Sequence, residues 1–203
     1  MNKIDLPLSK IEQVAFLEKL RTGVANYFLR KKVTKNNRER NIFNLRDAKT
    51  IGIIFNSASA EDVDLVKKYD SYLRDMGKTV KTMGYVGLKE PAINISWWPG
   101  EAYITREEIN WLYEPKEQFI HSFVQEGFDM LIDLNVNGEM PLMFVTASSK
   151  AKCKVGRYTE RYSNLYDVMI ETDETKTLKY FLRNVDTYME MLNKGRNVET
   201  AKH

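Results

Sequence analysis

Seven polar residues stand directly after three apolar runs of this sequence, and together they have the chemistry to hold a small anion. They are Asn56, Ser57, Ser59, Asp133, Asn135, Arg157 and Tyr158. A guanidinium surrounded by hydroxyl and amide groups suits a phosphate or a carboxylate. Asn and Ser after strands are also ordinary turn and capping residues, so a purely structural role is the alternative for most of the set.

A second set of residues makes up a basic arm between Arg30 and Arg46. The arm contains Arg30, Lys31, Lys32, Lys35, Arg38, Arg40 and Arg46. With Glu39 as its only acidic residue, the arm has a net charge of +6; because the whole chain carries +3, the remainder carries −3. Such an asymmetry favours an anionic partner, such as RNA, a ribosomal particle or an acidic protein. A solvated linker is the alternative.

No complete catalytic, metal or nucleotide-binding motif accompanies these two sets. The loop NSASAED has neither the G-x-G-x-x-G spacing nor a P-loop, so a dinucleotide or nucleoside triphosphate held in the usual way is not expected. His121, His203 and Cys153 do not make a zinc site. We expect His121 to be a surface or satisfied histidine, Cys153 a core thiol and Asp133 the anchor of a loop amide. We therefore assign no catalytic residue, metal or cofactor, and we favour a protein that is not an enzyme.

The elements that would position the seven strand-end residues alternate between strands and helices. Continuous apolar runs predict strands at 50–56, 78–87, 128–135, 153–158 and 166–171. Amphipathic spacing predicts helices at 57–77, 116–127, 140–151 and 177–195. This order predicts an α/β fold with three layers, Rossmann-like or flavodoxin-like, on a mostly parallel sheet of about five strands. Ligands of such sheets bind beyond the carboxyl ends of the strands, where the seven residues stand.

An N-terminal helix over residues 8–33 is predicted by a stripe of apolar residues at spacings of three and four. The stripe contains Ile11, Val14, Leu17, Leu20, Val24, Tyr27 and Phe28. It must be buried either against the body of the protein or against a partner, and self-association through this helix is one interpretation. We divide the chain into the helix and basic arm (1–47), a Rossmann-like domain (48–195) and a frayed tail (196–203).

The least regular segment spans residues 88–115 and holds all three tryptophans. Long aromatic insertions in compact domains are often functional. The alternative is a lid that packs Trp97, Trp98 and Trp111 over one face of the sheet.

The composition favours a globular, cytoplasmic protein. The chain has 203 residues, of which 43% are hydrophobic and 29% are charged, as expected for one domain with an extension. No apolar run is long enough to span a bilayer, and the start of the chain does not have the pattern of a secretory signal. A single cysteine fits a reducing compartment.

Several segments of the body resemble an uncharacterised family of short α/β proteins from Bacteroidota, a domain of unknown function. They are TIGIIFNSASAEDVDLVKKY, FDMLIDLN, SKAKCKVGRY and YDVMIE, and the resemblance extends over about residues 25–195. It implies a bacterial cytoplasmic protein and no particular activity. FDMLIDLN and SKAKCKVGRY are also similar to the N-terminal half of heptosyltransferase-type glycosyltransferases. Those enzymes need a second Rossmann-like domain, which we do not expect in this chain.

Two functions follow from these observations. The first is a non-enzymatic binding or assembly protein that docks its basic arm on RNA, a ribosomal particle or an acidic protein. The alternative is a protein that binds a phosphate- or carboxylate-bearing small molecule at the strand ends, or a degenerate transferase-like enzyme with its site there.

Overall fold

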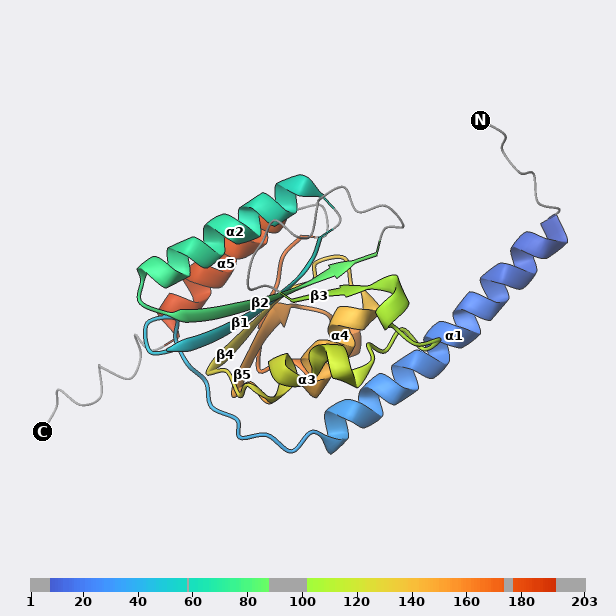
Figure 1. The fold of residues 1–203 in the computed structure, drawn as a ribbon, viewed down its shortest axis with the longest axis horizontal. Coiled ribbons are helices and arrows are strands. Elements are labelled where there is room, and N and C mark those ends of the chain that lie inside the picture. Colours follow the sequence, from blue (N-terminus) through green and yellow to red (C-terminus); the bar gives the residue numbers. More distant parts are fainter. Residues whose placement is uncertain (1–7, 58, 88–101, 174–176, 193–203) are drawn as a thin grey trace, which may run out of the picture.

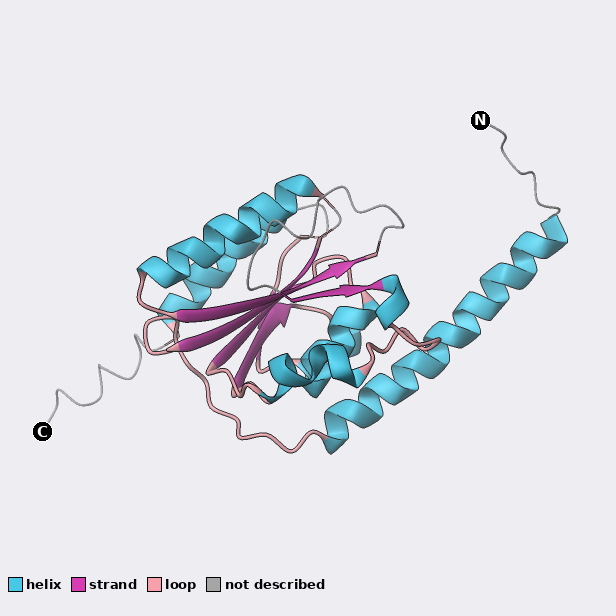
Figure 2. Cartoon of the chain, viewed as in Figure 1, coloured by secondary structure: helices cyan, strands magenta, loops and turns pink. Residues whose placement is uncertain are grey.

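Six parallel strands form one sheet in the order β3-β2-β1-β4-β5-β6 (Figures 1 and 2). The strands are β1 (Thr50–Asn56), β2 (Thr79–Val86), β3 (Ala102–Thr105), β4 (Met130–Leu134), β5 (Cys153–Arg157) and β6 (Val168–Ile170). The computed structural model describes residues 8–57, 59–87, 102–173 and 177–192. Both neighbours of β1 lie parallel to it, with Ile53 opposite Thr82 of β2 and Ile132 of β4. All the carboxyl ends of these strands therefore meet at one edge of the sheet.

The central strands β1 and β4 are buried along almost their whole length because both faces of the sheet are covered. The covering helices are α2 (Ala60–Asp75), α3 (Glu117–Gln125), α4 (Met140–Ser148) and α5 (Leu178–Met191). The α2 and α5 helices lie on one face, whereas α3 and α4 lie on the other (Figure 1). Successive side chains of a strand point to opposite faces, so β1 places Phe55 in the first core and Ile54 in the second.

Helix α4 is buried on every side, which is unusual for a helix that covers a sheet. All residues from Pro141 to Ala147 are buried. The reason is a further layer outside it, formed by the long helix α1 (Leu8–Lys35), which packs on α4 through Ala25 and Leu29 (Figure 1). A helix that is apolar all round needs such cover. The docked part of α1 therefore belongs to the core of the protein.

The predicted fold class is confirmed, and three details differ from the sequence-based prediction. The sheet has six strands and not about five, because β3 forms within the segment 88–115 that was expected to be irregular. All six strands are parallel, since the 3₁₀ turn η3 (Glu160–Leu165) carries the chain over the sheet between β5 and β6. Trp111 is 66% exposed and packs over no sheet face. Trp97, Trp98 and the predicted frayed tail lie outside the described residues.

The crossover between β5 and β6 depends on the close approach of Tyr166 to Gly156. A Cβ atom on Gly156 would lie 2.3 Å from the Cε1 atom and 2.5 Å from the Cζ atom of the Tyr166 ring. Real side chains do not come so near, so only a glycine lets this ring lie against β5. The ring cannot simply turn aside, because its hydroxyl donates a hydrogen bond to the buried Asp133.

We predict that Gly156→Ala lowers the free energy of unfolding by about 2 kcal/mol or more, as overpacking of a tight core does. Urea unfolding followed by circular dichroism measures the loss. The matched control is Gly23→Ala in α1, where nothing lies within 4 Å of the added Cβ. The control should gain about 0.5–1 kcal/mol, because alanine is the better helix former. Equal losses at both positions would contradict the packing argument.

Candidate functional site

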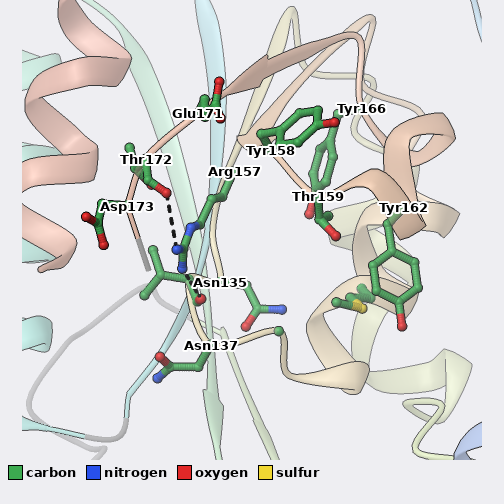
Figure 3. Close-up of a pocket in the computed structure, with 13 residues that line it drawn as sticks. Asn135, Asn137, Arg157, Tyr158, Thr159, Tyr162, Tyr166, Glu171, Thr172 and Asp173 are labelled. Atoms are coloured by element: carbon green, nitrogen blue, oxygen red, sulfur yellow. Dashed lines mark hydrogen bonds between the residues drawn. The ribbon is translucent and has the colours of Figure 1, made fainter. Parts of the chain in front are cut away.

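A cavity of about 700 Å³ lies at the carboxyl edge of the sheet, over the ends of β4, β5 and β6 (Figure 3). Its polar lining comes from Asn135, Asn137, Arg157, Tyr158, Thr159, Tyr162, Tyr166, Glu171, Thr172 and Asp173. Three of the seven strand-end residues predicted from the sequence, Asn135, Arg157 and Tyr158, meet in this cavity. It lies on one side of the switch point between β1 and β4, where sheets of this order bind ligands.

Among the described residues that line this cavity, Arg157 is the only cation. Its Nη1 donates to the carbonyl oxygen of Val136 at 2.9 Å, and its Nη2 donates to that of Thr172 at 3.3 Å. Figure 3 shows the guanidinium between these two segments. A guanidinium has five N–H donors, so these bonds fix its position while other donors remain for a ligand. Both acceptors are neutral, so neither of these bonds offsets the positive charge of Arg157.

The floor of the cavity continues into a buried polar cluster centred on Asp133. The hydroxyls of Thr146 and Tyr166 donate to its Oδ2 atom at 2.7 and 2.8 Å, and the backbone N–H of Asn135 donates to Oδ1 at 2.9 Å. The last bond confirms the expected role of Asp133 as the anchor of a loop amide. Burial raises the pKa of Asp133 to about 6, although the three donors and the positive charge of Lys154 act to lower it.

Lys154 brings a second buried charge into the same cluster. Its amine donates to the carbonyl oxygen of Thr146, and the residue is only 3% exposed. Burial, together with the positive charge of Arg38, lowers the pKa of Lys154 to about 7, although Asp167 acts to raise it. The same burial raises the pKa of Tyr166, whose hydroxyl faces Asp133. The cluster therefore holds groups that can change protonation close to neutral pH.

Most other strand-end residues predicted from the sequence are engaged within the fold. Ser57 donates to the carbonyl oxygen of Tyr85, and Ser59 caps α2 by accepting from the N–H of Asp62. The side chain of Asn135 holds the backbone of Glu139 from both sides, through its Oδ1 and Nδ2 atoms. These bonds match the structural alternative given above for Asn and Ser after strands.

Asn56 lies apart from the Arg157 cavity, on the other side of the switch point. Its Nδ2 donates to Glu139 Oε1 at 3.3 Å. There it lines a smaller cavity of about 400 Å³, together with Tyr85 and Arg106. Of the seven predicted residues, three thus line the first cavity and one lines the second, whereas Ser57, Ser59 and Asp133 are in neither lining.

The residues that follow β6 were absent from the predicted set. Glu171, Thr172 and Asp173 line the Arg157 cavity directly after the strand ends at Ile170. The carboxyl-end rule applied to the run YDVMIE would have found them. Tyr162 and Tyr166 were also missed, because they lie in and just after η3, which the sequence does not distinguish from a loop.

The basic arm is partly built into the fold. The guanidinium of Arg38 donates to both carboxylate oxygens of Asp167, at 2.8 and 2.6 Å, and to the carbonyl oxygens of Ala151 and Lys152. Lys32 pairs with Glu114. Five cations of the arm are exposed: Arg30, Lys31, Lys35, Arg40 and Arg46. The guanidinium of Arg40 also comes within 3.7 Å of Asp167.

The two other residues considered for chemistry, His121 and Cys153, have ordinary surroundings. His121 is exposed and lies 3.4 Å from Glu117, and Cys153 is a buried thiol whose pKa is raised by burial. Within the described ranges, no three His, Cys, Asp or Glu side chains gather in a way that could hold a metal ion. The described helices include none with the length and apolar character needed to cross a bilayer.

A doubly wound parallel sheet of order 3-2-1-4-5-6, with a polar cavity at its carboxyl edge, defines a Rossmann-like α/β protein. The chain belongs to a family of unknown function, DUF6913, whose family model matches residues 21–192. A search of curated proteins finds no match to the chain.

We predict that Lys154→Met changes how stability depends on pH. The pKa of Lys154 is about 7 in the folded protein and about 10.5 in the unfolded chain. Burying the charged amine therefore destabilises the folded state by its full amount below pH 7, and this destabilisation decreases as the pH rises. The wild-type protein should therefore gain stability relative to the variant between pH 7 and pH 10, by up to about 1.4 kcal/mol per pH unit.

Chemical denaturation across this pH range measures the difference between the two proteins. The control is Lys68→Met, which removes a lysine whose side chain is 73% exposed and should leave the pH dependence unchanged. Parallel curves for the wild type and Lys154→Met would contradict the buried, proton-releasing amine.

Proposed function

We propose that this protein binds a small molecule carrying one phosphate or carboxylate group, in the Arg157 cavity. The observation that carries the proposal is the Arg157 guanidinium, held by two backbone carbonyls at the carboxyl end of β5. A fixed guanidinium with spare donors recognises such oxyanions by paired hydrogen bonds.

The rest of the cavity supports a ligand with an organic body behind its anionic group. Tyr158, Tyr162 and Tyr166 give the wall broad apolar surfaces, while Asn137 and Thr159 supply hydrogen-bonding groups. Small-molecule sites combine these features, with a mostly apolar wall and a few convergent polar groups. A volume of about 700 Å³ is within the range of such sites.

The charges of the rim limit how negative this ligand is. Glu171 is exposed on the lining, where it disfavours further negative charge although the solvent screens it. A pyrophosphate would meet this carboxylate beside the single guanidinium of the described lining. This balance favours a single oxyanion, in agreement with the absence of the glycine-rich loops that hold a pyrophosphate.

We predict that inorganic phosphate at millimolar concentration raises the melting temperature of the wild-type protein, because a ligand that binds only the folded state stabilises it. Arg157→Gln should lose this effect, and Glu171→Gln should strengthen it by removing a repulsive charge. Differential scanning fluorimetry in phosphate, with chloride at equal ionic strength as reference, makes the measurement.

The matched control is Arg183→Gln, which removes an exposed arginine from α5, on the face of the sheet opposite to α3 and α4. It should respond to phosphate as the wild type does. A phosphate effect that persists in Arg157→Gln, or no effect in the wild-type protein, would contradict the proposed site.

A second proposal is that the basic arm docks on RNA or another anionic macromolecule. The observation that favours it is the exposure of Arg30, Lys31, Lys35, Arg40 and Arg46 on one continuous stretch of chain. Arg38 is left out of this surface because Asp167 already binds it. The Bacteroidota origin and the likeness to heptosyltransferases stay predictions and assign no activity.

We predict that this protein binds a fluorescent single-stranded RNA with an affinity that falls steeply with salt. Replacing Lys31, Lys35 and Arg40 by Gln should weaken binding at low salt by about tenfold or more and flatten the salt dependence. The control replaces three exposed cations on α2 and α5, Lys68, Lys179 and Arg183. Equal losses in both triple variants, measured by fluorescence anisotropy, would mean that the arm has no special role.

A further inference from the structure

Helix α1 carries an apolar stripe that packing among the described residues leaves uncovered. Seven large apolar side chains on this helix are exposed, with exposed fractions between 40% for Val24 and 63% for Tyr27. They are Val14, Phe16, Leu17, Leu20, Val24, Tyr27 and Phe28. From the sequence, burial against the body and burial against a partner were both open for such a stripe, and the helix packs on the body through a different face. Contiguous exposed apolar patches on a protein surface often mark interaction sites.

The buried and exposed faces of α1 lie on opposite sides of the helix. Leu29 is buried against the body, and Leu20 lies nine residues before it. At 3.6 residues per turn, nine residues correspond to about half a turn beyond two full turns, which places Leu20 on the far side. The same count places Leu17, Val24 and Tyr27 about 120° or more around the helix from Leu29. These residues and Leu20 therefore face away from the body, where another helix can approach them without meeting the sheet or α4 (Figure 1).

The spacing of the stripe is that of a helix that pairs with another helix. Leu17, Leu20, Val24 and Tyr27 follow each other at intervals of three, four and three residues, as the a and d positions of a coiled coil do. Continuing the intervals outwards gives Gln13 before the stripe and Lys31 after it. The seam is thus apolar in its middle and polar at both ends, which fits a partner helix of the same length.

We propose that α1 forms an antiparallel pair with α1 of a second copy of this chain. We align the two helices so that the residue numbers of each facing pair add to about 44. In this antiparallel register, Leu20 meets Val24 of the other copy and Leu17 meets Tyr27. The polar ends also match, because Gln13 meets Lys31. The stripe is therefore complementary to itself, as the interface of a two-fold symmetric dimer must be.

The side chains that flank the seam fit the same register. Phe16 lies beside the position of Arg30 in the other copy, where a guanidinium can stack on the ring, and Val14 lies beside Phe28. Two copies of Arg21 come together at the centre. Arg21 is directed toward the body, since its Nε donates to the carbonyl oxygen of Trp111 and its guanidinium lies 3.6 Å from the centre of the Tyr113 ring. Its charge is thus turned away from the seam.

Sedimentation equilibrium of the full chain tests whether the pair exists. We expect a mass of twice 23.7 kDa for the wild type, and a monomer for Leu20→Glu, which places a charge in the seam. The control Lys19→Glu introduces the same residue one position earlier, outside the seam, and should remain a dimer. Circular dichroism verifies that both variants are folded. A monomeric wild type at all concentrations, or a dimer that Leu20→Glu leaves intact, would overturn the proposal.

Cross-linking between two single variants tests the register. Gln13→Cys and Lys31→Cys are made in separate chains and mixed under mild oxidation; the native Cys153 is fully buried and does not compete. The antiparallel pair predicts a disulfide-linked dimer in the mixture but not in either variant alone, because two copies of the same position would lie about 27 Å apart. A disulfide in each variant alone would indicate a parallel pair, and none in the mixture a different interface; either result would overturn the proposal.

Discussion

The contact between the ring of Tyr166 and the backbone of Gly156 determines the geometry of the whole carboxyl edge. The ring lies so close to β5 that no side chain fits beneath it. Its hydroxyl thereby reaches Asp133 on the neighbouring strand, and the chain between β5 and β6 is drawn over the sheet as η3. One wall of the Arg157 cavity is the result. A larger residue at position 156 would move this wall and also take away one of the partners of the buried carboxyl group.

A chain of hydrogen bonds joins this wall to the basic arm. Arg38 binds Asp167, which also accepts from the backbone N–H of Lys154. The amine of Lys154 binds the carbonyl oxygen of Thr146, and the Thr146 hydroxyl binds Asp133. Isolated buried charges cost several kcal/mol each, so groups like these persist only where partners surround them. The arm after α1 is therefore required by the interior of the protein as well as available for an external partner.

The sequence was sufficient to predict the architecture where the physical signal is local. Continuous apolar runs identified five of the six strands because a sheet covered on both faces needs them. The strand β3 was missed because it has only four residues and follows a segment rich in tryptophan and proline. The helix α1 was predicted with nearly correct ends, but its buried face was not. Ala25 and Leu29 lie outside the stripe that most apolar residues of the helix form, yet they are the ones that fit against α4.

The candidate site could be located from the sequence but not described, and the reason is the distance between partners along the chain. Arg157 and Asp133 were found because the carboxyl-end rule depends only on where a strand stops. Their surroundings depend on residues 13 and 33 positions away for Asp133, and 21 and 15 positions away for Arg157. Such bonds form only once the sheet is assembled. The two residues also differ in their tertiary surroundings. The hydrogen-bond donors to Asp133 all belong to the protein itself, whereas Arg157 lines a cavity and has further N–H donors that a ligand could use. This contrast, which no local pattern contains, separates a residue that holds the fold together from one that, in our proposal, binds a ligand.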